Sequence, residues 1–426
     1  MVAHVRNTLK ELPPTLDDTY LRILRNINKS YRLQVRDVLK MLAFSNRPLR
    51  LEEIVEALAF NLDTKSFDED WRLEPLDVIE ICSSLVAVVD PQVKDEGQHE
   101  DGNHEETMAD DPNVSKKELR FAHYSVKEFL VSERTSTNWF HISEESAHAL
   151  IADRCIHYLL CHLDMSEDLT RQHLLEYPFL EYAARNWYKH ACLLETMDGN
   201  LNALIMQLFY PALNCCFQNW LKIWDPDREW AGVLPKEPEL IVQPLYYTAL
   251  IGFIDATNEL ITKGENVSVT GGYYGNPLCA ASVNGHLEVV KFLGEEGGAD
   301  VESKSNTGRT ALSFAAYNGR LDVVEFLVEE GGADVESKDN YGQTPLSFAA
   351  AMGRLEAVKF LVEQGGADVE SKDGKWGKTA LDVARRGIWE GWRWGDPEGR
   401  KAVAAWLEEH SRITNRGSKG NVNDGG

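Results

Sequence analysis

The chain has 426 residues, of which 43% are hydrophobic, and this length and composition predict a soluble globular protein of about two to four domains. Asp and Glu number 68 against 44 Lys and Arg, so the formal net charge is −24, which argues against a nucleic-acid or membrane-surface partner because both require basic patches. We find no transmembrane-length apolar run and no signal-peptide core, and therefore expect a cytoplasmic protein. The seven cysteines show no paired spacing, which favours reduced thiols.

The first predicted element is a helix within residues 1–32. Its apolar positions from Tyr20 to Ile27 recur at i, i+3, i+4 and i+7, which places them on one helical face. Thr15 follows two prolines and is the expected N-cap.

Residues 33–135 show the pattern of a winged-helix domain. Helical spacing is followed by two short β-branched segments, which predict a two-stranded ribbon. The predicted helices cover residues 35–42, 51–60 and 75–84, and the predicted strands cover residues 85–90 and 119–122. The third helix carries Asp77 and Glu80 and almost no basic residue, so we do not expect this domain to bind DNA.

An acidic insert at residues 92–118 separates the two predicted strands. It is rich in Asp, Glu, His, Gly and Asn and nearly free of large apolar side chains, so we expect it to be disordered. His99 and His104 with nearby carboxylates are possible metal ligands, but a flexible acidic loop is poorly preorganised. We therefore expect no metal site.

Residues 136–240 are predicted to form a helical linker block. An apolar stripe from Leu180 to Ala191 includes Trp187, and such aromatic side chains are most simply core residues. Four prolines between positions 226 and 244 predict a linker to the segment that follows.

A repeated pattern fills residues 241–410. Gly285, Gly319 and Gly353 are 34 residues apart, and a Thr-Pro-Leu-x-x-Ala-Ala-like phrase precedes each of them. A Val-Val-x-Phe-Leu-like helix and a Gly-Gly-Ala-Asp-Val ending follow. This period and signature resemble ankyrin repeats, which stack helix pairs into an α-solenoid with a concave binding face.

The ends of the solenoid are expected to differ from its centre. Residues 244–264 predict a degenerate first repeat with a polar capping surface. A fourth repeat starts at Trp376, is interrupted at residues 391–399, and ends in a helix at residues 401–407. The tail at residues 411–426 is expected to be disordered. The expected fold class is therefore mostly α: winged helix, helical linker block and ankyrin-repeat α-solenoid.

The variable positions beside the repeat motif are the candidate partner-binding residues, because they project from the hairpin and the inner helix of each ankyrin repeat. Tyr, Trp and Arg dominate interface hot spots, so we expect a protein partner on the concave face. The alternative is that these are scattered surface residues. The candidates are Asn306, Thr307, Arg309, Tyr317, Asn318, Asn340, Tyr341, Gln343, Ala351, Met352, Lys375, Trp376 and Lys378.

Four further phrases, at residues 12–20, 47–54, 121–130 and 177–184, resemble fungal NACHT-ankyrin proteins in the part that follows the NTPase core. The resemblance implies a signal-transducing nucleotide switch related to NOD-like receptors. A NACHT core needs a Gly-x-x-x-x-Gly-Lys-Ser/Thr loop to hold phosphates, and this chain has none. It therefore looks like the C-terminal part of such a receptor or a truncated gene model, with no cofactor and no nucleotide hydrolysis of its own.

Among the residues that carry this resemblance, His123 has the most specific implied role. Phe121, His123, Ser125, Glu128 and Phe129 match the NACHT-family phrase Phe-x-His-x-Ser-x-x-Glu-Phe, whose histidine approaches the β-phosphate of bound ADP. The resemblance thus implies a nucleotide sensor, valid only with a NACHT core. The alternative is structural, because Ser125 and Glu128 have capping-box spacing and would simply start a helix.

Three functions remain open at this stage. The leading one is partner or ligand sensing by the ankyrin array of a NACHT-type signalling protein. The others are an NTPase switch whose NACHT domain lies upstream or acts in trans, and a plain ankyrin adaptor. No nucleophile elbow and no His-Glu-x-x-His helix occur, so we do not expect an enzyme or a catalytic residue.

Overall fold

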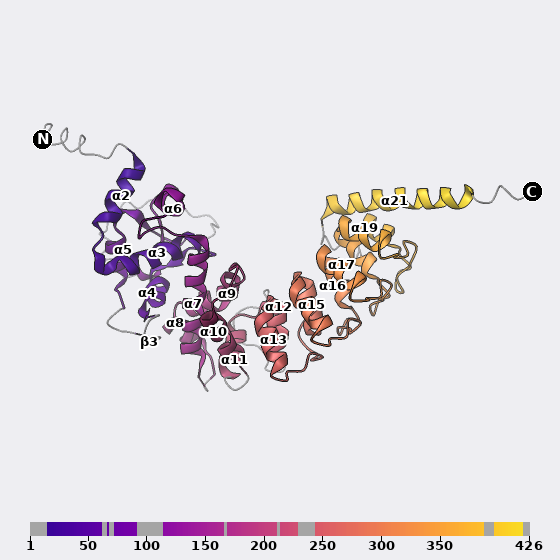
Figure 1. Cartoon of the computed structure of the whole chain (residues 1–426), viewed down its shortest axis with the longest axis horizontal. Helices are drawn as coiled ribbons and strands as arrows, with labels where there is room; N and C mark the ends of the chain where they lie inside the picture. Colours follow the sequence, from indigo (N-terminus) through magenta and orange to yellow (C-terminus); the bar gives the residue numbers. More distant parts are fainter. Residues whose placement is uncertain are drawn as a thin grey trace, which may run out of the picture. The chain divides into compact units, whose positions relative to one another are not determined.

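The computed structural model describes residues 15–61, 66–67, 72–91, 114–165, 168–210, 214–228, 243–386 and 396–420. The chain forms two compact units, Met1–Trp224 and Asp225–Gly426. Both are built mainly of helices, which confirms the mostly α fold class (Figure 1). Among the described residues, no helix combines the length and the apolar character that crossing a bilayer requires.

The first unit begins with short helices on an apolar core. Thr15 caps the first of them, as expected, because its hydroxyl accepts from the backbone N–H of Asp18 at 3.1 Å. The helical elements, in order, are α2 (Leu16–Asn26), η1 (Lys29–Tyr31), α3 (Arg32–Phe44), α4 (Leu51–Ala59), α5 (Pro75–Cys82) and η3 (Ser83–Leu85).

A three-stranded antiparallel sheet stands where a two-stranded ribbon was expected. Its order is β1 (Leu49–Arg50), β5 (Glu118–Phe121) and β4 (Val86–Val89). A two-residue strand such as β1 has no period to detect, so only its pairing with β5 identifies it. A separate short ribbon joins β2 (Phe60–Asn61) to β3 (Ser66–Phe67).

The C-terminal end of the predicted acidic insert is ordered, although its composition predicts disorder throughout residues 92–118. Residues 92–113 lie outside the described residues. Residues 114–118, however, contain the 3₁₀ turn η5 (Val114–Lys116) and the start of β5, where Glu118 pairs with Arg50 and Val89. Backbone pairing with neighbouring strands orders this end, and side-chain composition does not reveal such pairing.

The helical block belongs to the same unit as the segments before it. On α7, Arg154 donates to the Asp37 carboxylate of α3 at 2.6 Å and to the Phe60 carbonyl at 3.0 Å, and both charged side chains are buried. The fully buried rings of Trp187 and Trp220 lie 5.5 Å apart. The elements are α6 (Tyr124–Val131), η6 (Glu133–Thr135), α7 (Glu144–Leu163), α8 (Arg171–Glu176), α9 (Leu180–Ala191), α10 (Gly199–Phe209) and α11 (Asn214–Ile223).

The second unit stacks helix pairs in chain order. Figure 1 shows them from α12 onward, salmon-pink to yellow. The elements are η8 (Pro226–Arg228), α12 (Pro244–Ile251), α13 (Ile254–Thr262), α14 (Pro277–Asn284), α15 (Leu287–Glu295), α16 (Ala311–Asn318), α17 (Leu321–Glu329), α18 (Pro345–Met352), α19 (Leu355–Glu363), α20 (Ala380–Arg386) and α21 (Pro397–Gly420).

The repeated sequence phrase encodes the ends of each first helix. Thr310 and Thr344 are N-caps whose hydroxyls accept from backbone N–H groups three residues on. Pro345 follows at the first helical position, where its missing N–H has no intrahelical partner to lose. Gly319 and Gly353 end the helices at φ of 72° and 73°, in the left-handed region that glycine tolerates.

Both ends of the second unit differ from the sequence-based expectation. Every residue of α12 is buried, so the first repeat does not present a polar surface through this helix. Asp227, expected in a linker, and Asp225 just before it accept hydrogen bonds from the buried hydroxyls of Tyr246 and Tyr247 at 2.6 and 3.1 Å. Buried hydroxyls need acceptors, and this need recruits the preceding segment.

The last helix is also longer than predicted. α21 spans Pro397–Gly420, whereas a helix at residues 401–407 and a disordered tail from residue 411 were expected. Its buried side chains, Val403, Ala404 and Leu407, fix the first turns. Once a helix is nucleated, each further residue adds a backbone hydrogen bond, so a polar sequence continues it to Gly420. Residues 421–426 lie outside the described residues.

Candidate binding surface

The hairpins that lead into α18 and α20 are rigid projections from the repeats. The carboxylate of Asp339 accepts from the backbone N–H groups of Tyr341 and Gln343 at 2.8 and 2.9 Å. In the next hairpin, Asp373 accepts from the N–H of Trp376 at 2.6 Å. Such side-chain-to-backbone bonds replace the missing secondary structure of a turn.

Neighbouring hairpins are also bonded to one another. The N–H of Asn340 donates to the Thr307 carbonyl, and the N–H of Gly374 donates to the Tyr341 carbonyl, each at 3.1 Å. This backbone ladder runs from repeat to repeat, so it holds side chains at equivalent hairpin positions in a row. We call these hairpin side chains, together with Tyr317 of the inner helix α16, the finger surface. Its residues are Tyr273, Arg309, Tyr317, Tyr341, Lys375 and Trp376.

Arg309 lies at the centre of the finger surface. Its guanidinium carbon is 4.2 Å from the ring centre of Phe348 in the next repeat and 5.8 Å from that of Tyr317. Its Nε is 3.8 Å from the Asp339 carboxylate, too far for a hydrogen bond. Burial lowers the pKa of Arg309, while Asp339 and the neighbouring tyrosines oppose that shift.

A second cluster lies one repeat further along. The rings of Tyr341 and Trp376 are stacked with centres 6.3 Å apart, and the Lys375 ammonium is 4.7 Å from both centres. The Tyr341 side chain remains 41% exposed. Stacked aromatic rings beside a cation offer broad apolar area with little side-chain freedom left to lose on binding.

The structure places some of the predicted partner-binding residues close together and buries others. Arg309 and Tyr317 form one group, and Tyr341, Lys375 and Trp376 form another. Gln343 and Ala351 are buried, at 2% and 4% exposure, and therefore do not belong to the exposed row. The remaining candidates lie at exposed or half-buried positions without joining either group: Asn306, Thr307, Asn318, Asn340, Met352 and Lys378.

Sequence reasoning missed Tyr273, which is 55% exposed and close enough to Arg309 to affect the pKa of its guanidinium. Its signal was present, because Tyr273, Thr307 and Tyr341 occupy equivalent positions of the 34-residue repeat. The degenerate phrase around Tyr273 hid this correspondence. Gln343 occupies the position equivalent to Arg309, so periodicity alone could not tell which of the two is buried.

His123 occupies a capping position in the first unit. It is the N-cap of α6, and its Nδ1 accepts from the Ser125 backbone N–H at 3.2 Å. The phrase does start a helix, as the structural alternative predicts, but the N-cap is His123 and not Ser125. Since Nδ1 is an acceptor, the neutral ring carries its proton on Nε2. The imidazole is exposed, and Ser125 Oγ bonds in turn to the Tyr20 hydroxyl at 2.7 Å.

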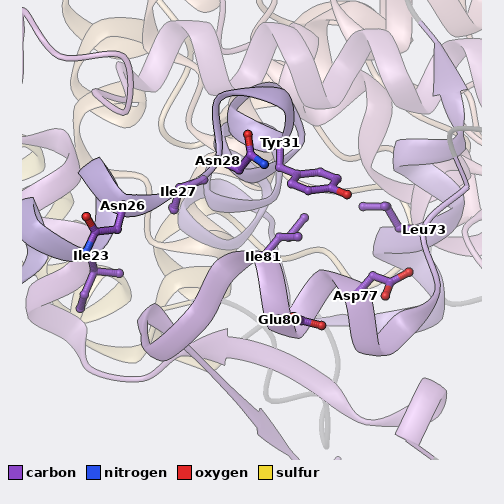
Figure 2. Close-up of a pocket in the computed structure, with 9 residues that line it drawn as sticks. All are labelled: Ile23, Asn26, Ile27, Asn28, Tyr31, Leu73, Asp77, Glu80 and Ile81. Carbon is purple, nitrogen blue, oxygen red and sulfur yellow. The ribbon is translucent and has the colours of Figure 1, made fainter.

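The first unit contains a cavity of about 420 Å³. In Figure 2 the Tyr31 ring lies near Ile81 and points toward Leu73. Asp77 and Glu80 lie along one side of the cavity, on α5. These carboxylates disfavour a phosphate-bearing ligand. The other lining residues are Ile23, Asn26, Ile27 and Asn28.

Comparison with known proteins identifies the class of the second unit. A model for a single ankyrin repeat matches residues 276–306, and a model for three ankyrin copies matches residues 298–373 and 332–387. The chain therefore carries ankyrin repeats at its C-terminal end, and such repeats are non-catalytic interaction modules.

Two curated relatives are similar to parts of the chain. The azaphilone pigments biosynthesis cluster protein L of Monascus ruber is 33% identical over 313 residues, which cover 69% of this chain and 61% of that protein. Alpha-latrotoxin-Lh1a of Latrodectus hasselti is 39% identical over 75 residues, which cover 18% of this chain and 5% of the toxin. The chain thus spans about three fifths of the length of the first relative and a small part of the second.

Proposed function

We propose that the ankyrin repeats of this chain bind a protein partner through the finger surface. The observation that carries the proposal is the presence of two rigid aromatic–cation groups along the finger surface, Arg309 over Phe348 and Lys375 over the Tyr341–Trp376 stack. Arg, Tyr and Trp are the residue types that most often carry binding energy at interfaces.

The finger surface carries two cationic side chains. The protein has a formal net charge of −24, yet Arg309 and Lys375 both lie here. A half-buried guanidinium packed over a ring has already lost much of its hydration and freedom, so it gains more from an acceptor than a mobile surface lysine does. A partner with a carboxylate beside an apolar side chain fits this arrangement.

The test starts with the full chain carrying a photoreactive residue in place of exposed Asn340. The captured protein is identified, purified and titrated against wild type, Arg309→Ala and a Tyr341→Ala, Trp376→Ala double variant. Hot-spot losses of about 2 kcal/mol or more predict at least a roughly thirtyfold rise in Kd for each, with unchanged melting temperature.

Lys359→Ala, on the second helix of its repeat, is the matched control and should bind like wild type. If the captured protein binds the double variant as tightly as wild type, the finger surface is not the binding site. A partner that crosslinks equally from a photoreactive residue at exposed Glu409 on α21 would point to the same conclusion.

We further propose that the first unit is the winged-helix part of a NACHT-type signalling protein. Its support is the ordered phrase from Phe121 to Phe129, which presents His123 with a proton on the exposed Nε2, able to donate to a phosphate oxygen. If the chain is joined to a NACHT domain from its own gene, His123→Ala should weaken ADP retention. His123→Asn keeps an N-cap acceptor and is the control for helix stability. Equal ADP affinity in the Ala variant would leave His123 as a cap only, and the chain as a plain ankyrin adaptor.

A further inference from the structure

Two adjacent cysteines of the first unit converge on an aspartate from another helix. Cys215 and Cys216 lie in the first turn of α11, and Asp164 is the C-cap residue of α7. The two Sγ atoms and a carboxylate oxygen all lie within 4.8 Å of one another. The Cys215 thiol donates to Asp164 Oδ1 at 3.1 Å. In the part of the chain that the structure describes, no other group of three such ligand atoms is this close.

The aspartate is held in place by the helix that carries the cysteines. One turn beyond Cys215, the buried side chain of Asn219 donates to the Leu163 carbonyl at 3.1 Å and to the Met165 carbonyl at 3.4 Å. These carbonyls flank Asp164 on both sides. Asn219 in turn accepts from the Lys222 ammonium at 3.2 Å. Hydrogen bonds behind the ligands are what orient them in metal sites.

The make-up of the cluster favours a cation. Once deprotonated, two thiols and a carboxylate bring three negative charges into one small volume, and a divalent ion that replaces the thiol protons offsets them.

We propose that Cys215, Cys216 and Asp164 bind a zinc ion that ties α11 to the end of α7. Two thiolates and a carboxylate are ligands that zinc accepts, whereas magnesium and calcium prefer oxygen alone. In tetrahedral geometry, zinc–sulfur bonds of about 2.3 Å place the ligand atoms roughly 3.8 Å apart. The present ligand atoms all lie within 4.8 Å of one another, so shifts of about 1 Å or less bring them around one ion. The two thiol protons leave to solvent, and a water takes the fourth position.

An ion can reach this site from solvent. Asp164 is exposed and Cys215 is half-exposed, while Cys216 is buried beneath them. Sequence patterns predict no such site, because the aspartate precedes Cys215 by 51 positions and adjacent cysteines have no established ligand spacing.

The test uses the full chain, reduced and freed of metal with a chelator, and titrates it with Co²⁺ as a spectroscopic substitute for zinc. The proposal predicts one equivalent bound, a thiolate-to-cobalt band in the near ultraviolet, tetrahedral d–d absorption, and displacement by Zn²⁺. Zinc should also raise the melting temperature of the first unit. The proposal is overturned if the reduced chain shows no thiolate-to-cobalt band. It is also overturned if the purified protein holds a Cys215–Cys216 disulfide and binds no metal after that disulfide is reduced.

Variants separate the site from the remaining thiols. Asp164 is exposed and Cys215 is half-exposed, so Asp164→Asn and Cys215→Ser should leave the helices intact. Each should weaken zinc binding at least roughly tenfold, because one of three protein ligands is lost. Cys192→Ser, at the C-terminal end of α9, is the matched control and should bind zinc like wild type. If Cys192→Ser weakens zinc as much as Cys215→Ser does, the ligands are elsewhere.

Discussion

Two buried histidines face each other in the first unit. His148 Nδ1 and His190 Nδ1 are 2.8 Å apart, and His190 Nε2 lies 3.0 Å from the Tyr182 hydroxyl. Burial, with a contribution from His148, lowers the pKa of His190 to about 3. Burial also lowers the pKa of His148, against the opposing effect of Glu144. Both rings are therefore neutral in the folded protein at pH 7.

This pair predicts a loss of stability in mild acid. Below about pH 6.5 the unfolded chain binds protons that folded His190 refuses, so its contribution is fully present above that pH and falls by at most about 1.4 kcal/mol per unit toward pH 3. Urea unfolding of the full chain between pH 7 and 4.5 measures this slope. His190→Gln should flatten it, whereas His410→Gln, outside the pair, should not. Identical slopes in all three proteins would contradict the assignment.

At the scale of elements, the repeats need glycine for two separate reasons. Gly342 has φ of 78° and Gly366 has φ of 70°, so both adopt a left-handed conformation. A methyl group at Gly342 would clash with the backbone of Gly374 in the next hairpin, whereas one at Gly366 would meet no atom within 4 Å. The two positions therefore share the conformational cost of a side chain and differ in the steric one.

Alanine substitution should separate the two costs. Gly366→Ala is expected to destabilise by about 1–2 kcal/mol, the usual penalty of a left-handed non-glycine residue. Gly342→Ala should cost about 1–3 kcal/mol more, because the hairpin must move to admit the methyl group. Urea midpoints of the second unit, followed by circular dichroism, report the difference. Equal losses of stability in the two variants would mean that the hairpins move apart to admit the methyl group without a measurable cost.

At the scale of the whole molecule, the second unit begins before its first repeat. Asp225 and Asp227 accept from Tyr247 and Tyr246, and Asp227 also accepts from the Tyr273 backbone N–H at 2.6 Å. A fragment that starts at the first ankyrin helix lacks these two carboxylate acceptors. The boundary that the fold requires thus lies earlier than the repeat pattern indicates.

This boundary is testable with two fragments. Residues 225–426 should melt at a clearly higher temperature than residues 243–426, because an unsatisfied buried donor costs about 1–3 kcal/mol. The longer fragment with Asp225→Ala and Asp227→Ala keeps its length and should fall to the lower melting temperature. If the shorter fragment is as stable as the longer one, the two carboxylates contribute nothing to the fold.

The sequence by itself determined what depends on nearby residues. The Thr–Pro starts and glycine ends of helices, the 34-residue period, and the hairpin positions of Tyr341 and Trp376 all follow from local backbone preferences repeated along the chain. The repeat period was enough to propose these two rings and Arg309 as candidate partner-binding residues. It could not reveal that Gln343, at the position equivalent to Arg309, is buried.

Only the tertiary structure decided which distant side chains meet. Arg154 reaches Asp37 across 117 positions, Asp164 meets Cys215 across 51, and Arg309 packs on a ring of the following repeat. A buried charge or polar group must find a partner wherever packing places one. That requirement is met by the contacts between elements, which no local pattern in the sequence records.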